Sequence, residues 1–383
     1  MLAGQEASIV SPPLRLVSCC DECVLLSTIK VLALTKYGRM GASSRMRFMQ
    51  YLPRLTQEGV DVTLRPLLSD DMLQRRYEEG GYKLRQLISA YAARFLELLH
   101  ARKFDVIWVE KEALQWWPAW LEQVLMRNVP FVLDYDDAVF HSYDRHSNPW
   151  VRRIYGQRLD RLMAKATVVV VGNEYLADRA RAAGSSRIEV IPTVIDLERY
   201  AIKSHIVPTD RPPRIVWIGS PATQGYLELI RQPLLELFRR QPFVFRVIGG
   251  DLAGLPAGLV EPVVWQMTTE AQSIEGADVG VMPLLDTPWE RGKCGYKLIQ
   301  FMACGLPVVA SPVGVNNEIV ESGENGFLAN TEEDWVISLE KLLVDVSMRS
   351  RLGAAGRKRV EEHYSLQVQA PRIARVLRDA AST

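Results

Sequence analysis

Short apolar runs rich in β-branched residues alternate with segments of helical periodicity along this chain. In the first half these runs cover residues 29–35, 60–67, 104–110, 129–136, 166–173 and 188–196. A second series follows the stretch VPTDRPP (207–213) and covers residues 214–220, 243–250, 260–266, 277–284 and 306–312. Such alternation is typical of α/β proteins with parallel sheets. The sequence therefore predicts two doubly wound, Rossmann-like sheets in tandem.

The chain length of 383 residues exceeds what one hydrophobic core usually covers, so two domains are expected. Periodicity lapses and prolines gather between about Asp196 and Pro213, which favours a linker there. We expect a tail over residues 1–28, a first domain over 29–195, a second over 196–365, and a last helix over 366–383 that completes the first domain. Because open α/β sheets bind ligands at the carboxyl ends of their strands, the cleft between the domains is the leading candidate site.

The overall composition excludes several classes of partner and of protein. Lys and Arg number 46 and Asp and Glu 45, so the net charge of +1 gives no reason to expect nucleic acid. Five cysteines are few and odd in number, which favours a reducing compartment. Cys19, Cys20 and Cys23 lack a second Cys or His pair at zinc-ligand spacing, so no metal site is expected. Without a membrane-length apolar run or a signal-peptide pattern, we expect a cytoplasmic protein.

The segment PWERGKCGYKLIQFMACG (288–305) concentrates positive charge ahead of a predicted strand. If a helix begins near Lys293, then Lys293, Lys297 and Gln300 lie in one stripe that faces away from the core. The free amides of a helix start, together with Arg291 and Lys293, would suit a diphosphate. The alternative is an ordinary solvated face with surface lysines.

The loop YGRMGASSRMRF (37–48) follows the first predicted strand. Gly41 permits a tight turn, and Ser43 or Ser44 could cap a helix whose free N–H groups face the cleft. A plain tight turn and a contact with an anion or a sugar are both compatible with this loop.

Three carboxylates, Asp134, Asp136 and Asp137, cluster at the end of the predicted strand at 129–136. Close carboxylates repel one another unless they bind a cation, accept hydroxyl hydrogen bonds or hold a proton. A metal, sugar hydroxyls or helix capping would each explain them. His141 follows closely and could carry a proton, although a loop histidine is often incidental.

The segment EALQWWPAWLEQVLMR (112–127) places Trp117, Trp120, Leu121 and Val124 at helical spacing. The favoured interpretation is a helix that covers the first sheet. The alternative is a contact for an apolar acceptor or for a membrane surface, which tryptophans often provide.

The chain resembles the GT-B glycosyltransferases of group 1, also called glycosyltransferase family 4, from Ile29 to Ser365. The most specific likeness is KLIQFMACGLPVVASPVGVNNEIVESGENGFL (297–328), which is similar to the donor-binding stretch of that family. Supporting strings are GASSR (41–45), IEVIPTVID (188–196), IGS (218–220) and RLGAAGRKRVEEHYS (351–365), all in the family order.

The resemblance implies transfer of a sugar from a nucleotide-diphosphate sugar to an acceptor hydroxyl, with retention at the anomeric carbon and no obligatory metal. The donor would lie on the second domain, near Gly219 and Ser220, and the acceptor on the first. The acceptor would be a sugar, a lipid-linked molecule or a small molecule in polysaccharide or glycoconjugate biosynthesis. Peripheral contact with the inner face of a membrane through the first domain is a further expectation.

The chain departs from the family pattern at three places. The family's E-x7-E glutamates are replaced by Gly292 and Gln300, although Gln300 could still contact the ribose. The diphosphate-binding Arg and Lys are missing from SPATQG (220–225), so we expect Arg291, Lys293 and Lys297 to replace them. A His common in the family corresponds to Asp136. The alternatives are therefore a non-catalytic GT-B protein that binds a nucleotide sugar, or a nucleotide-sugar epimerase.

Overall fold

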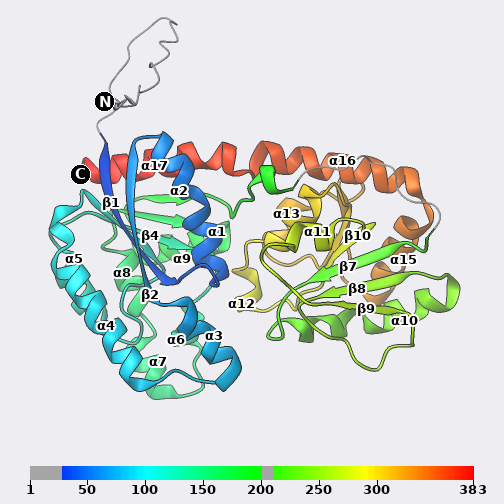
Figure 1. Cartoon of the computed structure of the whole chain (residues 1–383), viewed down its shortest axis with the longest axis horizontal. Helices are drawn as coiled ribbons and strands as arrows, with labels where there is room; N and C mark the ends of the chain where they lie inside the picture. Colours follow the sequence, from blue (N-terminus) through cyan, green and yellow to red (C-terminus); the bar gives the residue numbers. More distant parts are fainter. Residues whose placement is uncertain (1–27, 201–210) are drawn as a thin grey trace, which may run out of the picture.

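The computed structural model describes residues 28–200 and 211–383. It contains two α/β domains side by side, with two long C-terminal helices running along one face of both (Figure 1). Helix α16 (Val346–His363) lies along the second domain, and α17 (Leu366–Ala381) lies along the first. Cys19, Cys20, Cys23 and the expected N-terminal tail lie outside the described residues, apart from residue 28.

The first domain is built on a parallel six-stranded sheet in the order β2-β1-β3-β4-β5-β6. Its strands are β1 (Ile29–Tyr37), β2 (Val60–Leu68), β3 (Val106–Glu110), β4 (Phe131–Tyr135), β5 (Val168–Val171) and β6 (Ile188–Val190). Every residue of β3, β4 and β5 is buried, as expected for parallel strands that are covered by helices on both faces. The covering segments are α1 (Ala42–Arg47), η1 (Met49–Tyr51), α2 (Leu52–Gln57), α3 (Asp70–Glu79), α4 (Leu84–Leu99), η2 (Ala101–Lys103), α5 (Ala119–Met126), α6 (His141–Asp144), α7 (Pro149–Tyr155), α8 (Arg158–Met163), α9 (Glu174–Ala182) and η3 (Leu197–Arg199).

The second domain repeats this plan with a parallel six-stranded sheet in the order β12-β11-β10-β7-β8-β9. Its strands are β7 (Arg214–Ile218), β8 (Val244–Ile248), β9 (Val260–Val263), β10 (Val279–Met282), β11 (Val308–Ala310) and β12 (Gly326–Leu328). The helical segments are η4 (Gln224–Ile230), α10 (Arg231–Arg240), α11 (Glu270–Ile274), α12 (Pro288–Arg291), α13 (Tyr296–Ala303), α14 (Asn316–Ile319) and α15 (Glu332–Val344). The prediction of two Rossmann-like sheets in tandem is confirmed. Strand β12 was not predicted, because three residues are too short to show a strand pattern.

The chain crosses between the domains twice at one place. The Ile195 amide donates to the Tyr364 carbonyl (3.0 Å), and the Leu366 amide donates to the Ile195 carbonyl (2.9 Å). From there α17 returns to the first domain, where Ile373 and Leu377 join the core beside β1, β3 and β4. The first crossing and the return crossing are therefore held together by two backbone hydrogen bonds.

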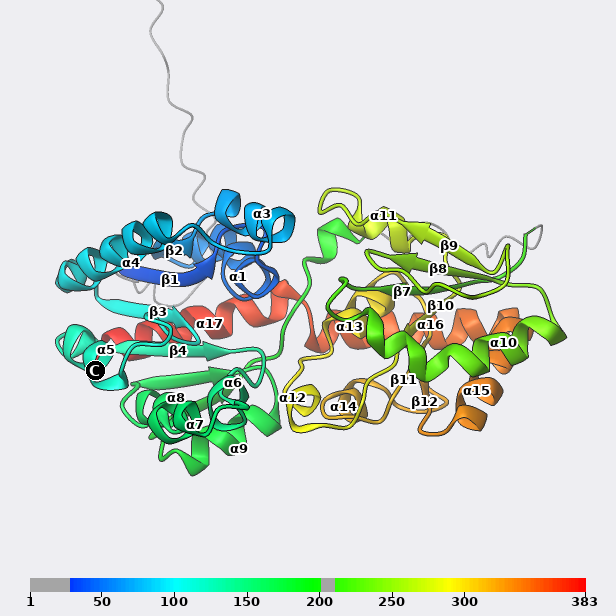
Figure 2. The same ribbon diagram turned by 90° about the horizontal axis from the view of Figure 1, so that it is seen from below.

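A second contact between the domains is made by the loop between α12 and α13, which faces the first domain in Figure 2. The Asn173 side-chain amide donates to the carbonyls of Gly292 (3.1 Å) and Lys293 (3.0 Å). The Cys294 thiol, buried in the core of the first domain, contacts the Asp136 carbonyl oxygen (3.0 Å). These contacts join the loop to the first domain.

Helix α5 differs from its prediction. It begins at Ala119, and Trp120 and Val124 are 62% and 48% exposed rather than packed on the sheet. Ala119, Glu122 and Met126 are buried in their place. Across residues 28–200 and 211–383, no helix has the length and apolar character needed to cross a membrane.

Candidate active site

The first-domain side of the cleft carries a compact group of paired charges around Lys111. This lysine directly follows β3, and its ammonium group contacts Asp136 Oδ1 (2.9 Å), Asp137 Oδ2 (2.8 Å) and Ser43 Oγ (3.1 Å). The sequence predicted Asp136, Asp137 and Ser43 as site residues, and the structure brings them together. Lys111 was missed, although its place at the carboxyl end of a predicted strand could have identified it.

Asp134, the third carboxylate of the predicted cluster, has a different partner. Its Oδ1 contacts Arg47 Nε at 2.7 Å, and both side chains are almost fully buried. Each of the three carboxylates therefore contacts a cation of the chain itself, although Lys111 is shared between Asp136 and Asp137. Within residues 28–200 and 211–383, no group of three or more His, Cys, Asp or Glu side chains is arranged to hold a metal ion.

Asp136 is held in its ionised form. Burial acts to raise its pKa, but the attraction of Lys111, with help from Ser43 and Arg47, outweighs burial, so the pKa lies below its usual value. The same ion pairs hold the pKa of Lys111 well above its usual value, against the effect of burial. Among the described residues, Asp137 Oδ1 has no hydrogen-bond partner. This atom is therefore available to accept a hydrogen bond from a ligand hydroxyl.

Two other first-domain expectations need revision. Gly41, rather than Ser43 or Ser44, is the N-cap residue of α1, and no side chain caps this six-residue helix. Ser44 instead donates to Glu110 Oε2 (2.6 Å) within the core. His141 has both ring nitrogens engaged, by Asp144 (2.8 Å) and by Tyr175 (2.9 Å). We therefore do not include His141 in the catalytic machinery proposed below.

The second-domain side of the cleft presents two lysines without a carboxylate partner. Lys297 Nζ lies 4.7 Å from the ring centroid of Trp217, and Lys293 Nζ lies 5.8 Å from that of Tyr226. Neither ammonium group has a hydrogen bond or an ion pair with any residue that the structure describes. Aromatic faces attract cations but do not neutralise them. The two lysines therefore form an uncompensated positive site.

The pKa of Lys297 reflects this environment. Burial lowers it from 10.5 to about 7, and the positive charge of Lys293 adds to the decrease. An anion bound between the two ammonium groups would favour the protonated form of Lys297. The site is therefore suited to a dianionic or trianionic group such as a diphosphate.

The helix start predicted near Lys293 is wrong. The segment forms two helices, α12 and α13, separated by a loop in which Gly295 adopts φ 64°, a left-handed conformation that glycine tolerates well. Lys297 is the second residue of α13, so it still lies in the first turn of a helix. Lys293 lies in this loop and Lys297 in α13, and the charge of Lys293 acts on Lys297.

Gln300 and Arg291 do not lie as predicted. The Gln300 side chain is only 2% exposed, and its amide nitrogen donates to Glu270 Oε1 (2.7 Å) and to the Tyr200 hydroxyl (3.1 Å). The expected outward stripe therefore does not include Gln300. Arg291 is exposed at the surface, where it forms a two-point ion pair with Asp286 at 2.7 and 3.0 Å.

The loop after β7 brings Gly219 and Ser220 to the carboxyl end of the second sheet. A Cβ atom on Gly219 would lie 2.2 Å from the Trp217 ring, so Gly219 allows that ring to lie close to the backbone while Lys297 contacts it. Ser220 is exposed, and its amide donates to Thr223 Oγ1 (3.1 Å).

Glu290, which sequence reasoning overlooked, is buried in the same region. Its carboxylate accepts hydrogen bonds from the hydroxyls of Tyr226 and Thr287. Since Tyr226 is also the ring beneath Lys293, this carboxylate fixes one wall of the lysine site.

Gly292 occupies the position where the resemblance implies a glutamate. A Cβ atom there would lie 2.5 Å from Ala138 Cβ and 2.8 Å from the Ala138 nitrogen. Because its carbonyl also accepts from Asn173, Gly292 is one of the points at which the two domains touch. Close packing at the domain contact therefore explains the missing side chain.

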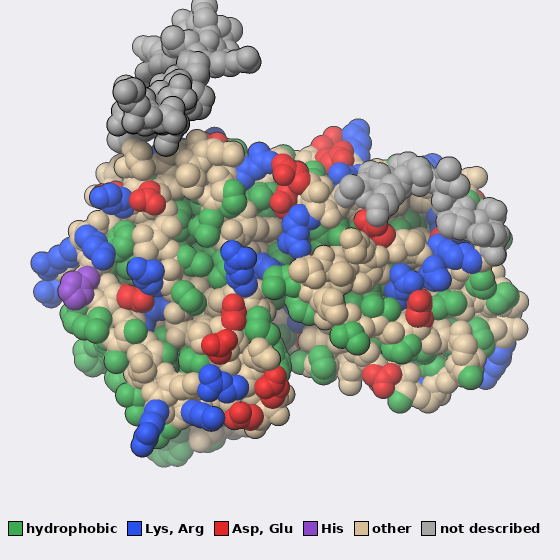
Figure 3. Space-filling model, viewed as in Figure 1, with side chains coloured by type: hydrophobic (Ala, Val, Ile, Leu, Met, Phe, Trp, Pro, Cys, Tyr) green, Lys and Arg blue, Asp and Glu red, His purple; other side chains and the backbone are tan. Residues whose placement is uncertain are grey.

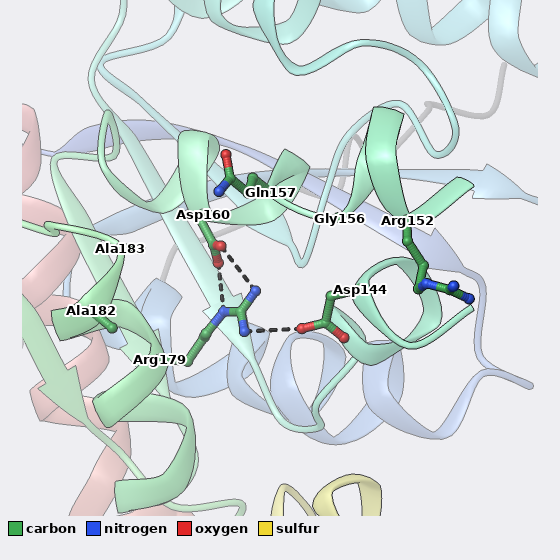
Figure 4. A pocket seen from close by; sticks show the side chains of 8 residues that line it. All are labelled: Asp144, Arg152, Gly156, Gln157, Asp160, Arg179, Ala182 and Ala183. Carbon is green, nitrogen blue, oxygen red and sulfur yellow. Dashed lines mark hydrogen bonds and ion pairs between the residues drawn. The ribbon is translucent and has the colours of Figure 1, made fainter. Parts of the chain in front are cut away.

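A separate hollow in the first domain is lined by residues of α6 to α9 (Figure 4). Arg179 at its base is paired with Asp160 (2.6 Å) and Asp144 (3.0 Å). Its charges are balanced within the protein, so the hollow offers less to an anion than the lysine site does.

The fold is that of a GT-B protein, with two Rossmann-like domains side by side. Residues 28–193 match the glycosyl transferase 4-like domain, and residues 212–345 match the glycosyl transferases group 1 domain. The chain belongs to the group 1 glycosyltransferases, of the family 4 type, which confirms the resemblance seen in the sequence.

Among solved structures, the chain is similar to HepE from Anabaena in complex with UDP, with a TM-score of 0.67 and 16% identity over 92% of this chain and 100% of that chain. Sucrose-phosphate synthase from Thermosynechococcus elongatus has a TM-score of 0.65 and 16% identity over 92% of this chain and 98% of that one. At these identities the likeness shows the shared fold.

Among curated proteins, the chain is 25% identical to the sulfoquinovosyl transferase of Arabidopsis thaliana, over 82% of this chain and 66% of that protein. It is 27% identical to a GDP-mannose-dependent phosphatidylinositol monomannoside mannosyltransferase of Mycolicibacterium smegmatis, over 57% of this chain and 64% of that protein. The chain thus spans a little less than two thirds of each of these relatives.

Proposed function

We propose that the protein transfers a sugar from a nucleoside-diphosphate sugar to an acceptor hydroxyl, with retention of the anomeric configuration. The observation that carries the proposal is the pair of cleft lysines, Lys293 and Lys297, which lack a carboxylate partner among the described residues. Burying an uncompensated cation costs free energy, so such a site is most easily explained by an anion that completes it.

In the proposed reaction the two lysines bind the diphosphate of the donor. Negative charge on the leaving diphosphate grows as its bond to the sugar breaks. Fixed ammonium groups in a largely closed cleft then stabilise the transition state more than the bound substrate. Because the lysines supply this positive charge, we propose that no metal is obligatory. Gly219 and Ser220 would line the donor site, and Arg291 has a lesser part because Asp286 already neutralises it.

On the opposite side, we propose that Asp136 and Asp137 bind hydroxyls of the transferred sugar or of the acceptor. Lys111 holds Asp136 ionised and depresses its pKa, which makes it a good hydrogen-bond acceptor but a weak general base near neutral pH. Gly41 and Ser43, at the start of α1, would border the same pocket. Gln300 is left out of the donor contacts because it is buried and bonded to Glu270.

The comparisons support a nucleotide-sugar donor and leave several acceptor classes open. HepE was solved with UDP-glucose, and the Mycolicibacterium relative is named for a phosphatidylinositol mannoside. We accordingly propose a sugar, lipid-linked or small-molecule acceptor in polysaccharide or glycoconjugate synthesis. Cys294 and Cys304 are free thiols, which agrees with the proposed cytoplasmic location.

Calorimetric titration with UDP, GDP, ADP and TDP, followed by a product assay with the matching sugar donors, tests the proposal. We expect one diphosphate to bind, transfer or hydrolysis of its sugar to occur, and the rate to survive EDTA. NMR of the product should show the anomeric configuration of the donor. Absence of binding by all four diphosphates, at protein concentrations that detect millimolar affinity, would contradict the proposal.

A second candidate is a non-catalytic nucleotide-sugar-binding protein. It is favoured by one observation, the replacement of both family glutamates by Gly292 at the domain contact and Gln300 in the interior. Diphosphate binding without turnover of any sugar donor, with a sugar mixture and a membrane lipid extract as acceptors, would favour it over the transferase. An epimerase would instead convert the donor sugar without an acceptor.

A further inference from the structure

The first domain exposes an apolar surface on the helices that follow β2, β3 and β4. On α4 the outward residues Leu84, Ile88, Leu96 and Leu99 are 57–71% exposed. On and just before α5 these are Trp116, Trp117, Trp120 and Val124, and on α7 they are Trp150 and Ile154. All four tryptophans that are exposed within the described residues belong to this surface, which we call the tryptophan face.

The tryptophan face is continuous. The Trp117 ring packs against Phe95 of α4, with centroids 5.2 Å apart. The Trp116 ring packs against Tyr143 of α6 (4.9 Å) and Tyr155 of α7 (5.9 Å). Two adjacent tryptophans thus join α4 to α7. In the view of Figure 3, hydrophobic side chains gather along the outer edge of the first domain, beside Lys and Arg side chains.

Trp116 also has a positive φ of 64°, a conformation that is uncommon and costly for a bulky residue. The structure therefore holds this side chain at the surface against a backbone preference. About half of this side chain stays exposed although it packs on Tyr143 and Tyr155, so a partner that covered the rest would bury further apolar area.

The charge around the tryptophan face is positive. Between residues 83 and 161, nine Lys and Arg side chains are exposed, and Asp105 is the one exposed carboxylate. Arg85 and Lys103 flank the outward face of α4, Arg127 follows α5, and Arg153 precedes Ile154. Since the whole chain has a net charge of only +1, this local excess is a segregation of charge.

Acidic residues of these helices form ion pairs with arginines of the same domain. Glu97 pairs with Arg94 (3.2 Å), and Glu122 pairs with Arg158 in the core. Asp144 and Asp160 both pair with Arg179. Because arginines balance these carboxylates, they contribute little negative charge to the outer surface.

We infer that the tryptophan face docks on a lipid bilayer that contains anionic lipids. Tryptophans lie favourably at the boundary of headgroups and acyl chains, and exposed Lys and Arg are attracted to anionic headgroups. A second copy of this chain is a poorer occupant, because its own positive rim would repel the first. The inference does not depend on the transfer reaction.

Sedimentation of the full chain with vesicles tests the inference. We expect binding to vesicles of 70% phosphatidylcholine and 30% phosphatidylglycerol, and at least tenfold weaker binding to phosphatidylcholine alone. Raising the salt from 0.1 M to 1 M shortens the screening length from about 10 Å to about 3 Å and should release much of the bound protein.

The double variant Trp120→Glu, Trp150→Glu should bind the anionic vesicles at least tenfold more weakly. Val344→Glu is the matched control, because Val344 is 68% exposed on α15 of the other domain, and it should bind as the parent does. Both variants should keep the parental affinity for the diphosphate, which separates failure of this inference from failure of the proposed function. Equal loss in the Val344 variant, or no binding of the parent protein to anionic vesicles, would overturn the inference.

Discussion

The two sides of the cleft differ in how their charged side chains are paired. On the first-domain side, Lys111 pairs with both Asp136 and Asp137, and Arg47 pairs with Asp134. On the second-domain side, Lys293 and Lys297 face aromatic rings and have no carboxylate partner within residues 28–200 and 211–383. Each carboxylate of the first side thus has a cation of the chain beside it, whereas we propose that the lysines of the second side gain their counter-charge from a bound anion.

This difference assigns the two sides different tasks. Paired carboxylates keep a fixed geometry, which suits the recognition of neutral hydroxyls by direction. Unpaired lysines attract charge and respond to its growth, which suits a leaving diphosphate. Variants that remove one side at a time should therefore produce distinguishable losses.

Lys297→Met should have the largest effect. Loss of this ammonium group should lower the transfer rate by about 10²–10³-fold, which is typical for removal of one group that stabilises developing negative charge. The same change removes a partly buried cation that has no carboxylate partner among the described residues, so the melting temperature should stay the same or rise. Steady-state kinetics and thermal denaturation measure the two effects.

Lys341→Met is the control for that variant, because Lys341 also lies over an aromatic ring, Phe327 at 5.7 Å, but on α15. It should retain parental activity. A Lys297 variant that transfers sugar at the parental rate would show that the lysine site is not the diphosphate site.

Lys111→Met should affect stability as well as activity. It leaves two carboxylates close together without their cation, which should cost about 3 kcal/mol of unfolding free energy and reduce transfer by tenfold or more. The pKa of Asp136 should rise, since Lys111 is the group that lowers it most. Chemical denaturation at pH 7 and pH 5 measures the change; equal stability of variant and parent would contradict the paired-charge description.

Gly292→Ala should reduce transfer by about tenfold. The new methyl group would overlap the Ala138 backbone at the domain contact, so the lobes must separate slightly and misplace the two sides, and small misplacements are costly in catalysis. Gly225→Ala is the matched control, because a Cβ there has no heavy atom within 4 Å. Similar losses in both variants would remove the domain contact as the cause.

The pH dependence of diphosphate binding sharpens the comparison further. The pKa of Lys297 is about 7 in the free protein and should rise when an anion binds. Binding at pH 8 should therefore take up close to one proton, and affinity should fall by up to tenfold per pH unit above 7 until the bound-state pKa is reached. Titrations in buffers of different ionisation heat count the protons. Lys297→Met should abolish the uptake.

Arg291→Ala should have the smallest effect, a change in transfer rate of less than about threefold. Its guanidinium group is exposed and already paired with Asp286, and exposed ion pairs contribute little. Kinetic constants at 0.15 M salt measure this. A tenfold loss would mean that Arg291 leaves Asp286 to bind the donor.

Much of the architecture was readable in the sequence. Buried parallel strands such as VIWVE and VVVV appear as continuous apolar runs, and the helices between them follow from periodicity. The family strings around 297–328 and the proposal that Asp136, Asp137 and Lys297 act in the site also follow from local sequence. Strand β12 was not predicted, because three residues are too few to show the sequence pattern of a strand.

Tertiary structure alone decided the partners of the charged and polar side chains. Sequence spacing suggested that Gln300 and Lys297 share one outward stripe, yet packing turns Gln300 inward to Glu270, thirty residues away. It likewise pairs Lys111 with Asp136 and leaves Lys293 and Lys297 without a carboxylate. The physical reason is that apolar periodicity is a local property of the chain, whereas charge compensation depends on groups that only folding brings together.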